Sequence, residues 1–176
     1  IRRFERALVR AADATAAVSA ADAAALRDLA PQARIAVVPN GVDLDHYAPA
    51  DPGAEIATRC VFTGKMDFRP NIDAMAWFCE RVWPRVRDAR PDATLAIVGR
   101  DPAPRVAALA DPVRGIAVTG AVPDTRTHLA EAGIVVVPLR VGGGTRLKLL
   151  EAMAMAKPVV ATTLAVEGLD VVDGVE

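Results

Sequence analysis

Residue types that mark several classes of protein are scarce in this chain. Only 4% of its 176 residues are aromatic, and the formal net charge is −1. Proteins that bind nucleic acid usually carry a basic patch with aromatic side chains between the cations, so the sequence gives no support for that function. The longest apolar runs also fall far short of the ~20 residues that a membrane-spanning helix needs.

Cysteine and histidine are equally rare, at two residues each. Cys60 and Cys79 lie in apolar stretches, which predicts buried free thiols in a reducing cytoplasm and argues against a disulfide framework. His46 and His128 are isolated, and no cluster of Cys, His or Asp has the spacing of metal ligands. We therefore expect no metal site and no nucleophilic triad.

The remaining composition is that of an ordinary globular domain, with 52% hydrophobic and 24% charged residues. This balance excludes an intrinsically disordered chain, and the length suits one domain of average size. The sequence starts at Ile1 and stops at Glu176 without a closing helix. We therefore expect a fragment of a longer soluble protein.

Strands and helices alternate from residue 59 onward. Apolar runs predict strands at 59–63, 93–98, 116–119, 134–137 and 159–160, with a last short strand near Val171. Helices are expected between them, beginning at Pro70–Asn71, 103, Asp124 and Thr145, with Pro84 kinking or restarting the first. This alternation predicts right-handed βαβ units, and hence a Rossmann-like α/β fold with about six parallel strands and helices on both faces.

The first 50 residues follow a different pattern. The predicted elements are a basic amphipathic helix (2–12), a strand (14–18), a helix from Ser19 or Ala20 to about Pro31 and a strand (35–38). A Pro-Asn-Gly turn and a linker rich in Pro, Asp and Gly (42–54) come next. We therefore expect two parts, residues 1–50 and a sheet domain over 51–176.

Residues 134–161 are the most informative stretch, because they are predicted to form a strand, a glycine loop, a helix and a strand. Three consecutive glycines lead into a helix that Thr145 is expected to cap. The free backbone N–H groups and the dipole of such a helix start bind anions, most often phosphates. Lys148 and Glu151 follow on one face of this helix, where a cation suits a diphosphate and a carboxylate suits the ribose hydroxyls.

Other glycines are expected near this loop. Ligands of parallel α/β sheets bind beyond the carboxyl ends of the strands. Gly64, Gly99, Gly120 and the triple glycine all come just after predicted strands, so we expect them at one edge of the sheet. A nicotinamide-dinucleotide fingerprint is disfavoured, because it follows the first strand of the sheet and needs an acidic residue after the next strand.

Five segments, taken in order, resemble the group-1 glycosyltransferases of the GT-B fold. They are VPNGVD (38–43), FTGKM (62–66), LAIVG (95–99), VTGAV (118–122) and GGGTRLKLLEAMAMAKPVVA (142–161). The resemblance implies that residues 51–176 are the donor-binding domain, truncated at its C-terminal end. Residues 1–50 would be the tail of the acceptor-side domain with the interdomain linker.

The resemblance also implies an activity. The full-length protein would transfer a sugar from a nucleotide-diphosphate sugar to an acceptor hydroxyl, with retention of configuration and without a metal or other cofactor. It would serve bacterial polysaccharide or glycolipid synthesis in the cytoplasm, and peripheral association with a membrane is compatible with this. Its partners would be the nucleotide-sugar donor and the missing N-terminal acceptor-binding domain, without which we expect weak donor binding and no turnover. Two other classes stay open at this stage: a related GT-B epimerase or phosphorylase, and a non-catalytic nucleotide-binding module.

By the same resemblance, catalysis would depend on Lys65, Lys148 and Glu151. Glu151 matches the second glutamate of the family's paired-glutamate motif, which accepts the ribose hydroxyls, and Lys65 matches a base that neutralises phosphate. The donor would also contact Gly64, Gly142, Gly143, Gly144, Thr145, Arg146 and Leu147. Gly143 stands where the family has its first glutamate, so the donor sugar must be held in another way.

Simpler explanations compete with these assignments. A glycine triplet is also typical of a flexible turn, and Glu151 could pair with Lys148 as a surface ion pair. Lys65 could be an ordinary exposed loop lysine, and Arg146 could cover the diphosphate or face solvent. Lys157, at the end of its helix, is expected to act as a partner of the helix dipole.

Overall fold

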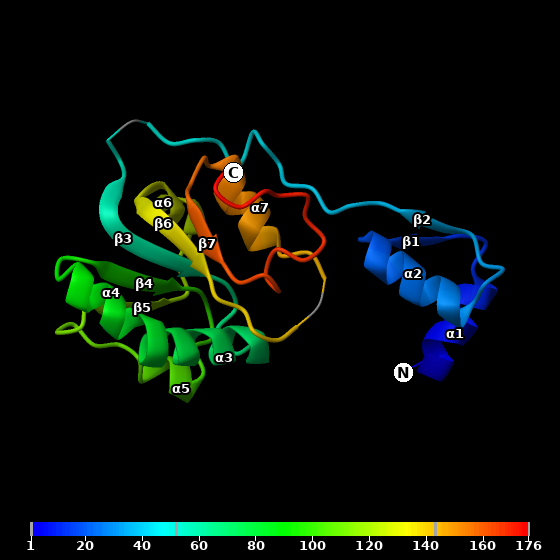
Figure 1. The fold of residues 1–176 in the computed structure, drawn as a ribbon, viewed down its shortest axis with the longest axis horizontal. Coiled ribbons are helices and arrows are strands. Elements are labelled where there is room, and N and C mark those ends of the chain that lie inside the picture. Colours follow the sequence, from blue (N-terminus) through cyan, green and yellow to red (C-terminus); the bar gives the residue numbers. More distant parts are fainter. Residues whose placement is uncertain (1, 52, 143, 176) are drawn as a thin grey trace.

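The computed structural model describes residues 2–51, 53–142 and 144–175. Its central feature is a five-stranded parallel sheet in the order β5-β4-β3-β6-β7 (Figure 1). The strands are β3 (Ile56–Thr63), β4 (Thr94–Val98), β5 (Ile116–Gly120), β6 (Ala132–Val137) and β7 (Val159–Ala161). They correspond to the first five predicted strands, so the predicted Rossmann-like α/β class is confirmed.

The sixth predicted strand, near Val171, is wrong. Residues 162–169 form turns, closed by hydrogen bonds from Ala165 N to Thr162 O (2.9 Å) and from Leu169 N to Val166 O (3.0 Å). These turns carry the chain away from β7, and residues 170–172 pair with no strand in the described part of the chain. A β-prone sequence needs a partner strand to become a strand, which explains the error.

Helices cover both faces of the sheet, as predicted (Figure 1). They are α3 (Arg69–Trp77), α4 (Trp83–Ala89), α5 (Pro104–Ala107), α6 (Thr125–Ala130) and α7 (Leu147–Ala154). The chain runs outward from β3 to β4 and β5, then returns to the other side of β3 for β6 and β7. Right-handed crossovers therefore place α3, α4 and α5 on one face and α6 and α7 on the other. The strand order reverses between β3 and β6, which is where ligands of this fold class bind.

Pro84 interrupts the helix that follows α3, as predicted. Proline has no N–H, and its ring clashes with the carbonyl four residues earlier, here that of Glu80. The chain accommodates this with a π-helical turn, η1 (Phe78–Val82), in which the Trp83 N–H donates to Phe78 O before α4 continues. Trp83 is fully buried and belongs to the core.

The core lies between the sheet and the two helical layers. Its largest fully buried side chains are Trp83, Phe62, Met66, Met75, Leu95, Ile97, Leu129 and Leu149. Cys60 and Cys79 are buried free thiols, as predicted. Burial raises the pKa of the Cys79 thiol to about 11, so this group stays protonated at neutral pH.

A small unit of two helices and two strands precedes the sheet domain. Its elements are α1 (Arg2–Ala11), β1 (Thr15–Ala17), α2 (Ala20–Leu29) and β2 (Ile35–Val37), all close to their predicted positions. β1 pairs with β2 in parallel, and the Ser19 hydroxyl caps α2 by accepting from Asp22 N at 3.1 Å. The assignment of residues 1–50 to the tail of another domain stays a prediction.

Hydrogen bonds attach the segment between β2 and β3 to the sheet domain. Arg126 on α6 donates from Nη1 to His46 O at 3.0 Å. The ammonium of Lys157 is buried and donates to Ala130 O at 2.7 Å and to Glu55 Oε2 at 3.1 Å. Ala130 is the last residue of α6, so Lys157 is a partner of a helix dipole, although of α6 rather than of its own helix.

Candidate functional site

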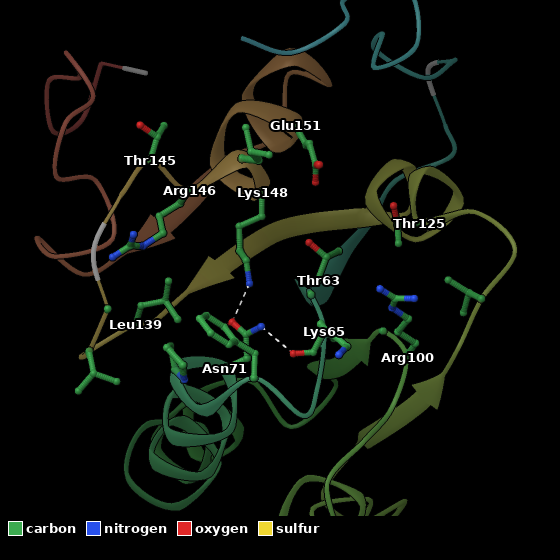
Figure 2. A pocket seen from close by; sticks show the side chains of 18 of the residues that line it. Thr63, Lys65, Asn71, Arg100, Thr125, Leu139, Thr145, Arg146, Lys148 and Glu151 are labelled. Carbon is green, nitrogen blue, oxygen red and sulfur yellow. Dashed lines mark hydrogen bonds between the residues drawn. The ribbon is translucent and has the colours of Figure 1, made fainter. Parts of the chain in front are cut away.

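A cleft of about 630 Å³ lies at the carboxyl edge of the sheet, where the strand order reverses (Figure 2). Residues at or after the ends of β3, β4, β5 and β6 line it, together with residues of α3 and α7. The predicted site residues among them are Gly64, Lys65, Gly142, Thr145, Arg146, Leu147, Lys148 and Glu151. Gly144 does not line the cleft, and Gly143 lies outside the described residues.

One of the strand-end glycines is required by a close approach of the backbone. A Cβ on Gly99 would lie 1.6 Å from Gly64 O, so only glycine fits there. A Cβ on Gly64 would lie 2.8 Å from the ends of two side chains, at Lys148 Nζ and Asn71 Nδ2, and the φ of +154° at Gly64 also favours glycine. The strand ends therefore converge on one edge as predicted.

The start of α7 leaves backbone donors available at the cleft. Arg146 occupies the N-cap position with extended φ and ψ, and no side chain caps the helix. The predicted cap by Thr145 is therefore wrong, because Thr145 lies one residue too early for its hydroxyl to take that role. Within the described residues, the N–H groups of Thr145, Leu147 and Lys148 have no hydrogen-bond partner. Such N–H groups suit an anion.

Lys148 points from α7 toward α3, on the other face of the sheet (Figure 2). Its Nζ donates to Asn71 Oδ1 at 3.0 Å and lies 4.0 Å from the centre of the Phe62 ring. Burial lowers the pKa of Lys148; the charge of Glu151 opposes this shift and the charge of Arg146 adds to it, and together they give a pKa of about 7. The ammonium is therefore poorly solvated and lacks a carboxylate partner within hydrogen-bond distance in the described structure. A phosphate would compensate its charge.

Asn71 has a different role from the predicted helix cap. It lies in the first turn of α3, whose N-cap is Phe68, and its side chain caps no backbone group of that helix. Instead its Nδ2 donates to Lys65 O at 2.8 Å, while its Oδ1 accepts from Lys148. The Asn71 side chain therefore joins the loop after β3 to α7.

Glu151 extends from α7 into the same cleft, toward Thr125 (Figure 2). It makes no ion pair with Lys148 within the described residues, so the surface-pair explanation is not supported. Burial raises the pKa of Tyr47, and a hydrogen bond and the charge of Glu151 raise it further. The phenol of Tyr47, in the segment between β2 and β3, therefore lies beside the Glu151 carboxylate.

The other cations of the cleft are more exposed. Lys65 Nζ pairs with Asp67 Oδ2 at 2.8 Å, and both side chains are about half exposed. Its charge is therefore shared with a carboxylate at the rim. The Arg146 guanidinium donates to Gly144 O and so folds back on the glycine loop. The structure thus places both predicted cations at the cleft without assigning either a ligand.

Sequence reasoning misses several polar residues of the cleft. Arg100 follows Gly99 as Lys65 follows Gly64, and this repeated pattern of a strand, a glycine and a cation is the signal that could have found it. Thr125 has no comparable signal, because it comes from the start of a helix. The sequence points to Asn71 only as part of the start of a helix.

The described residues contain neither a metal-binding cluster nor a membrane span. No group of three or more His, Cys, Asp or Glu side chains among them lies close enough together to hold a metal ion. None of the described helices combines the length and the apolar character that crossing a membrane requires.

The fold and the cleft define a Rossmann-like domain whose sheet edge carries cations and backbone N–H groups. Comparison with known families gives a specific assignment. The family model "Glycosyl transferases group 1" matches residues 57–176, and the chain belongs to this family. A second model, "Glycosyltransferase Family 4", matches residues 1–46. A search of curated protein sequences finds no match.

Three solved structures illustrate the similarity of fold. A sucrose-phosphate synthase from Thermosynechococcus elongatus is 21% identical (TM-score 0.71), over 94% of this chain and 44% of its own. HepE from Anabaena, in complex with UDP and glucose, is 18% identical (TM-score 0.63), over 92% of this chain and 48% of its own. TarM is 18% identical (TM-score 0.72), over 90% of this chain and 31% of its own. The chain thus spans less than half the length of each of these proteins, and at these identities the likeness concerns the fold alone.

Proposed function

We propose that the intact protein transfers a sugar from a nucleotide-diphosphate donor to an acceptor hydroxyl, and that this chain supplies the donor site. The observation that carries the proposal is the convergence of Lys148, Glu151 and the N–H groups at the start of α7 on one cleft. The ammonium and N–H groups suit a diphosphate, and the carboxylate suits ribose hydroxyls. Family membership and the complexes of HepE with UDP and UDP-glucose support the same function.

In this transfer, the bond between the sugar C1 and the diphosphate oxygen breaks, and its electron pair leaves with the diphosphate. A bond forms between C1 and the acceptor oxygen, whose proton ends on the departing diphosphate. Negative charge therefore grows on the phosphates, where Lys148 and the N–H groups of Thr145 and Leu147 would stabilise it. Glu151 would hold the ribose and so align the donor.

Further parts of the proposal follow from the family. We infer that the reaction retains the anomeric configuration and uses protein cations in place of a metal. The acceptor site would belong to a separate N-terminal domain, so this chain alone would bind donor weakly and have no turnover. The acceptor would be a polysaccharide or glycolipid precursor made in a bacterial cytoplasm, with peripheral membrane association of the full-length protein.

Calorimetry with nucleotides tests the donor site. The purified protein is titrated with UDP, GDP and ADP, and with the corresponding nucleosides. We expect at least one diphosphate to bind with a Kd below ~1 mM, and at least about tenfold more tightly than its nucleoside, because the charged contacts go to the phosphates. No binding of any diphosphate at millimolar concentration would overturn the proposal.

Turnover by the intact protein tests the reaction class. The nucleotide sugar whose nucleotide binds best is incubated with and without candidate acceptors, and with EDTA. The proposal predicts sugar transfer only when an acceptor is present, and the same rate with EDTA. Conversion of the donor without an acceptor would instead identify an epimerase, and loss of activity with EDTA would contradict the metal-free mechanism.

A further inference from the structure

Asn71 joins three segments that line the cleft. It is 5% exposed and lies on α3, on the opposite face of the sheet from α7. Its Oδ1 accepts from Lys148 Nζ at 3.0 Å, and its Nδ2 donates to Lys65 O at 2.8 Å (Figure 2). One side-chain amide therefore connects α3, the loop after β3 and α7.

Chemistry fixes the orientation of this amide. An ammonium can only donate hydrogen bonds and a backbone carbonyl can only accept them. The Asn71 oxygen must therefore face Lys148, and its nitrogen must face Lys65 O. Asparagine provides a neutral acceptor and a donor on two separate atoms, whereas aspartate would place two acceptors there.

The neutrality of the acceptor matters for the charge of Lys148. An ammonium has three N–H donors, and Asn71 takes one of them without cancelling the positive charge. Phe62 covers another side of the group, with its ring centre 4.0 Å away. The ammonium is thus held in one place while its charge stays available to a ligand.

We propose that Asn71 is a positioning residue for the donor diphosphate: its amide holds the Lys148 ammonium and the Lys65 loop in place without neutralising the lysine. The inference rests on the proposed function, since it assigns a role within the same donor site. Nothing in it requires Asn71 to touch the nucleotide.

An Asn71→Asp variant separates this role from simple packing. Its carboxylate has nearly the same shape, but it would form an ion pair with Lys148 and repel Lys65 O. The charged groups lining the cleft near Lys148 are Glu151 on α7, Arg146 before it, and Lys65 and Arg100 at the strand ends. A new carboxylate adds to Glu151 in favouring the charged lysine, so the pKa of Lys148 would rise in this variant.

The experiment measures nucleoside diphosphate affinity against pH. The purified protein is titrated by calorimetry between about pH 6 and pH 9 with whichever of UDP, GDP or ADP binds. For the wild type, affinity should fall as pH rises and Lys148 loses its proton. For the Asn71→Asp variant, the affinity at pH 6 should be about tenfold lower than that of the wild type. The loss of affinity with rising pH should also begin at a higher pH than in the wild type. Asn40→Asp, at an exposed position outside the cleft, adds the same charge and should match the wild type.

Asn71→Ala guards against a folding defect. It removes the acceptor for Lys148 without adding a charge, so the affinity for the diphosphate should fall about tenfold relative to the wild type. The pH at which binding weakens should not shift upward. Thermal melting checks that each variant is folded. If folded Asn71 variants bind with the affinity and pH profile of the wild type, the positioning role is wrong while the donor site stands. If the wild type binds no diphosphate, the donor site and this inference both fail.

Discussion

Gly99 lies so close to Gly64 that a Cβ at position 99 would be 1.6 Å from the Gly64 carbonyl oxygen. The backbone reinforces this contact, because Gly64 N donates to Val98 O at 3.0 Å and Met66 N donates to Arg100 O at 2.9 Å. The ends of β3 and β4 are thereby held together at the cleft. Their packing determines where the loop after β3 lies.

We therefore expect Gly99→Ala to destabilise the protein by at least about 2 kcal/mol, since the new methyl group must displace backbone rather than a flexible side chain. Chemical denaturation measures the difference. Gly41→Ala is the matched control, because a Cβ there meets nothing within 4 Å, and it should change stability by less than about 0.5 kcal/mol. Equal stability of the two variants would show that the strand ends are not packed as described.

Lys148 should make stability depend on pH. Burial lowers its pKa to about 7 in the folded protein, from the ordinary lysine value of 10.5 that applies to the unfolded chain. Between these values the unfolded chain binds more protons, so the contribution of Lys148 to stability rises with pH across this window and is least favourable below pH 7.

Lys148→Met removes this buried charge. We expect its Tm to exceed that of the wild type by a few degrees near pH 6.5, with a smaller difference near pH 9.5. Thermal melting at both pH values measures the effect, and Lys65→Met, at an exposed position, should show no such trend. A Lys148→Met protein that is less stable than the wild type at both pH values would contradict the assigned burial.

Glu151 should recognise ribose specifically. We expect Glu151→Ala to weaken binding of a ribonucleoside diphosphate about tenfold, but to leave binding of the 2′,3′-dideoxy analogue nearly unchanged, because the analogue offers no hydroxyl to the carboxylate. Calorimetry with both ligands measures the coupling, and Glu80→Ala, an exposed change elsewhere, is the control. Equal losses for both ligands would remove the ribose role of Glu151.

Two lysines with opposite environments should differ in their effect on folding. Lys157 is buried and donates to Ala130 O and Glu55, so Lys157→Ala should cost about 2 kcal/mol, partly because Glu55 and the end of α6 lose their partner. Lys65→Ala, which breaks an exposed ion pair, should cost less than about 0.5 kcal/mol. Urea denaturation of the two variants gives the comparison, and the reverse order of stabilities would be inconsistent with the structure.

The fold is predictable because its signals are local. Each strand of the main sheet is an apolar run that ends near a glycine or a polar residue, and each helix has a recognisable start or a proline at its edge. The strand predicted near Val171 fails because pairing depends on a distant partner, which local propensity does not report.

The site is predictable only where chemistry is concentrated in one segment. Lys148 and Glu151 share a helix, so their spacing alone places them on one face. Asn71 reaches the cleft, and Tyr47 reaches Glu151, from positions far away in the sequence, and only the folded chain brings them there. The residue type of Thr145 predicts a helix cap, whereas the backbone gives that position to Arg146.

A structure of the protein with bound nucleoside diphosphate tests the central claim most directly. We predict that the phosphate oxygens accept hydrogen bonds from Lys148 and from the N–H groups at the start of α7, with the ribose hydroxyls on Glu151. A nucleotide bound elsewhere, or bound here with its phosphates turned away from α7, would contradict this account.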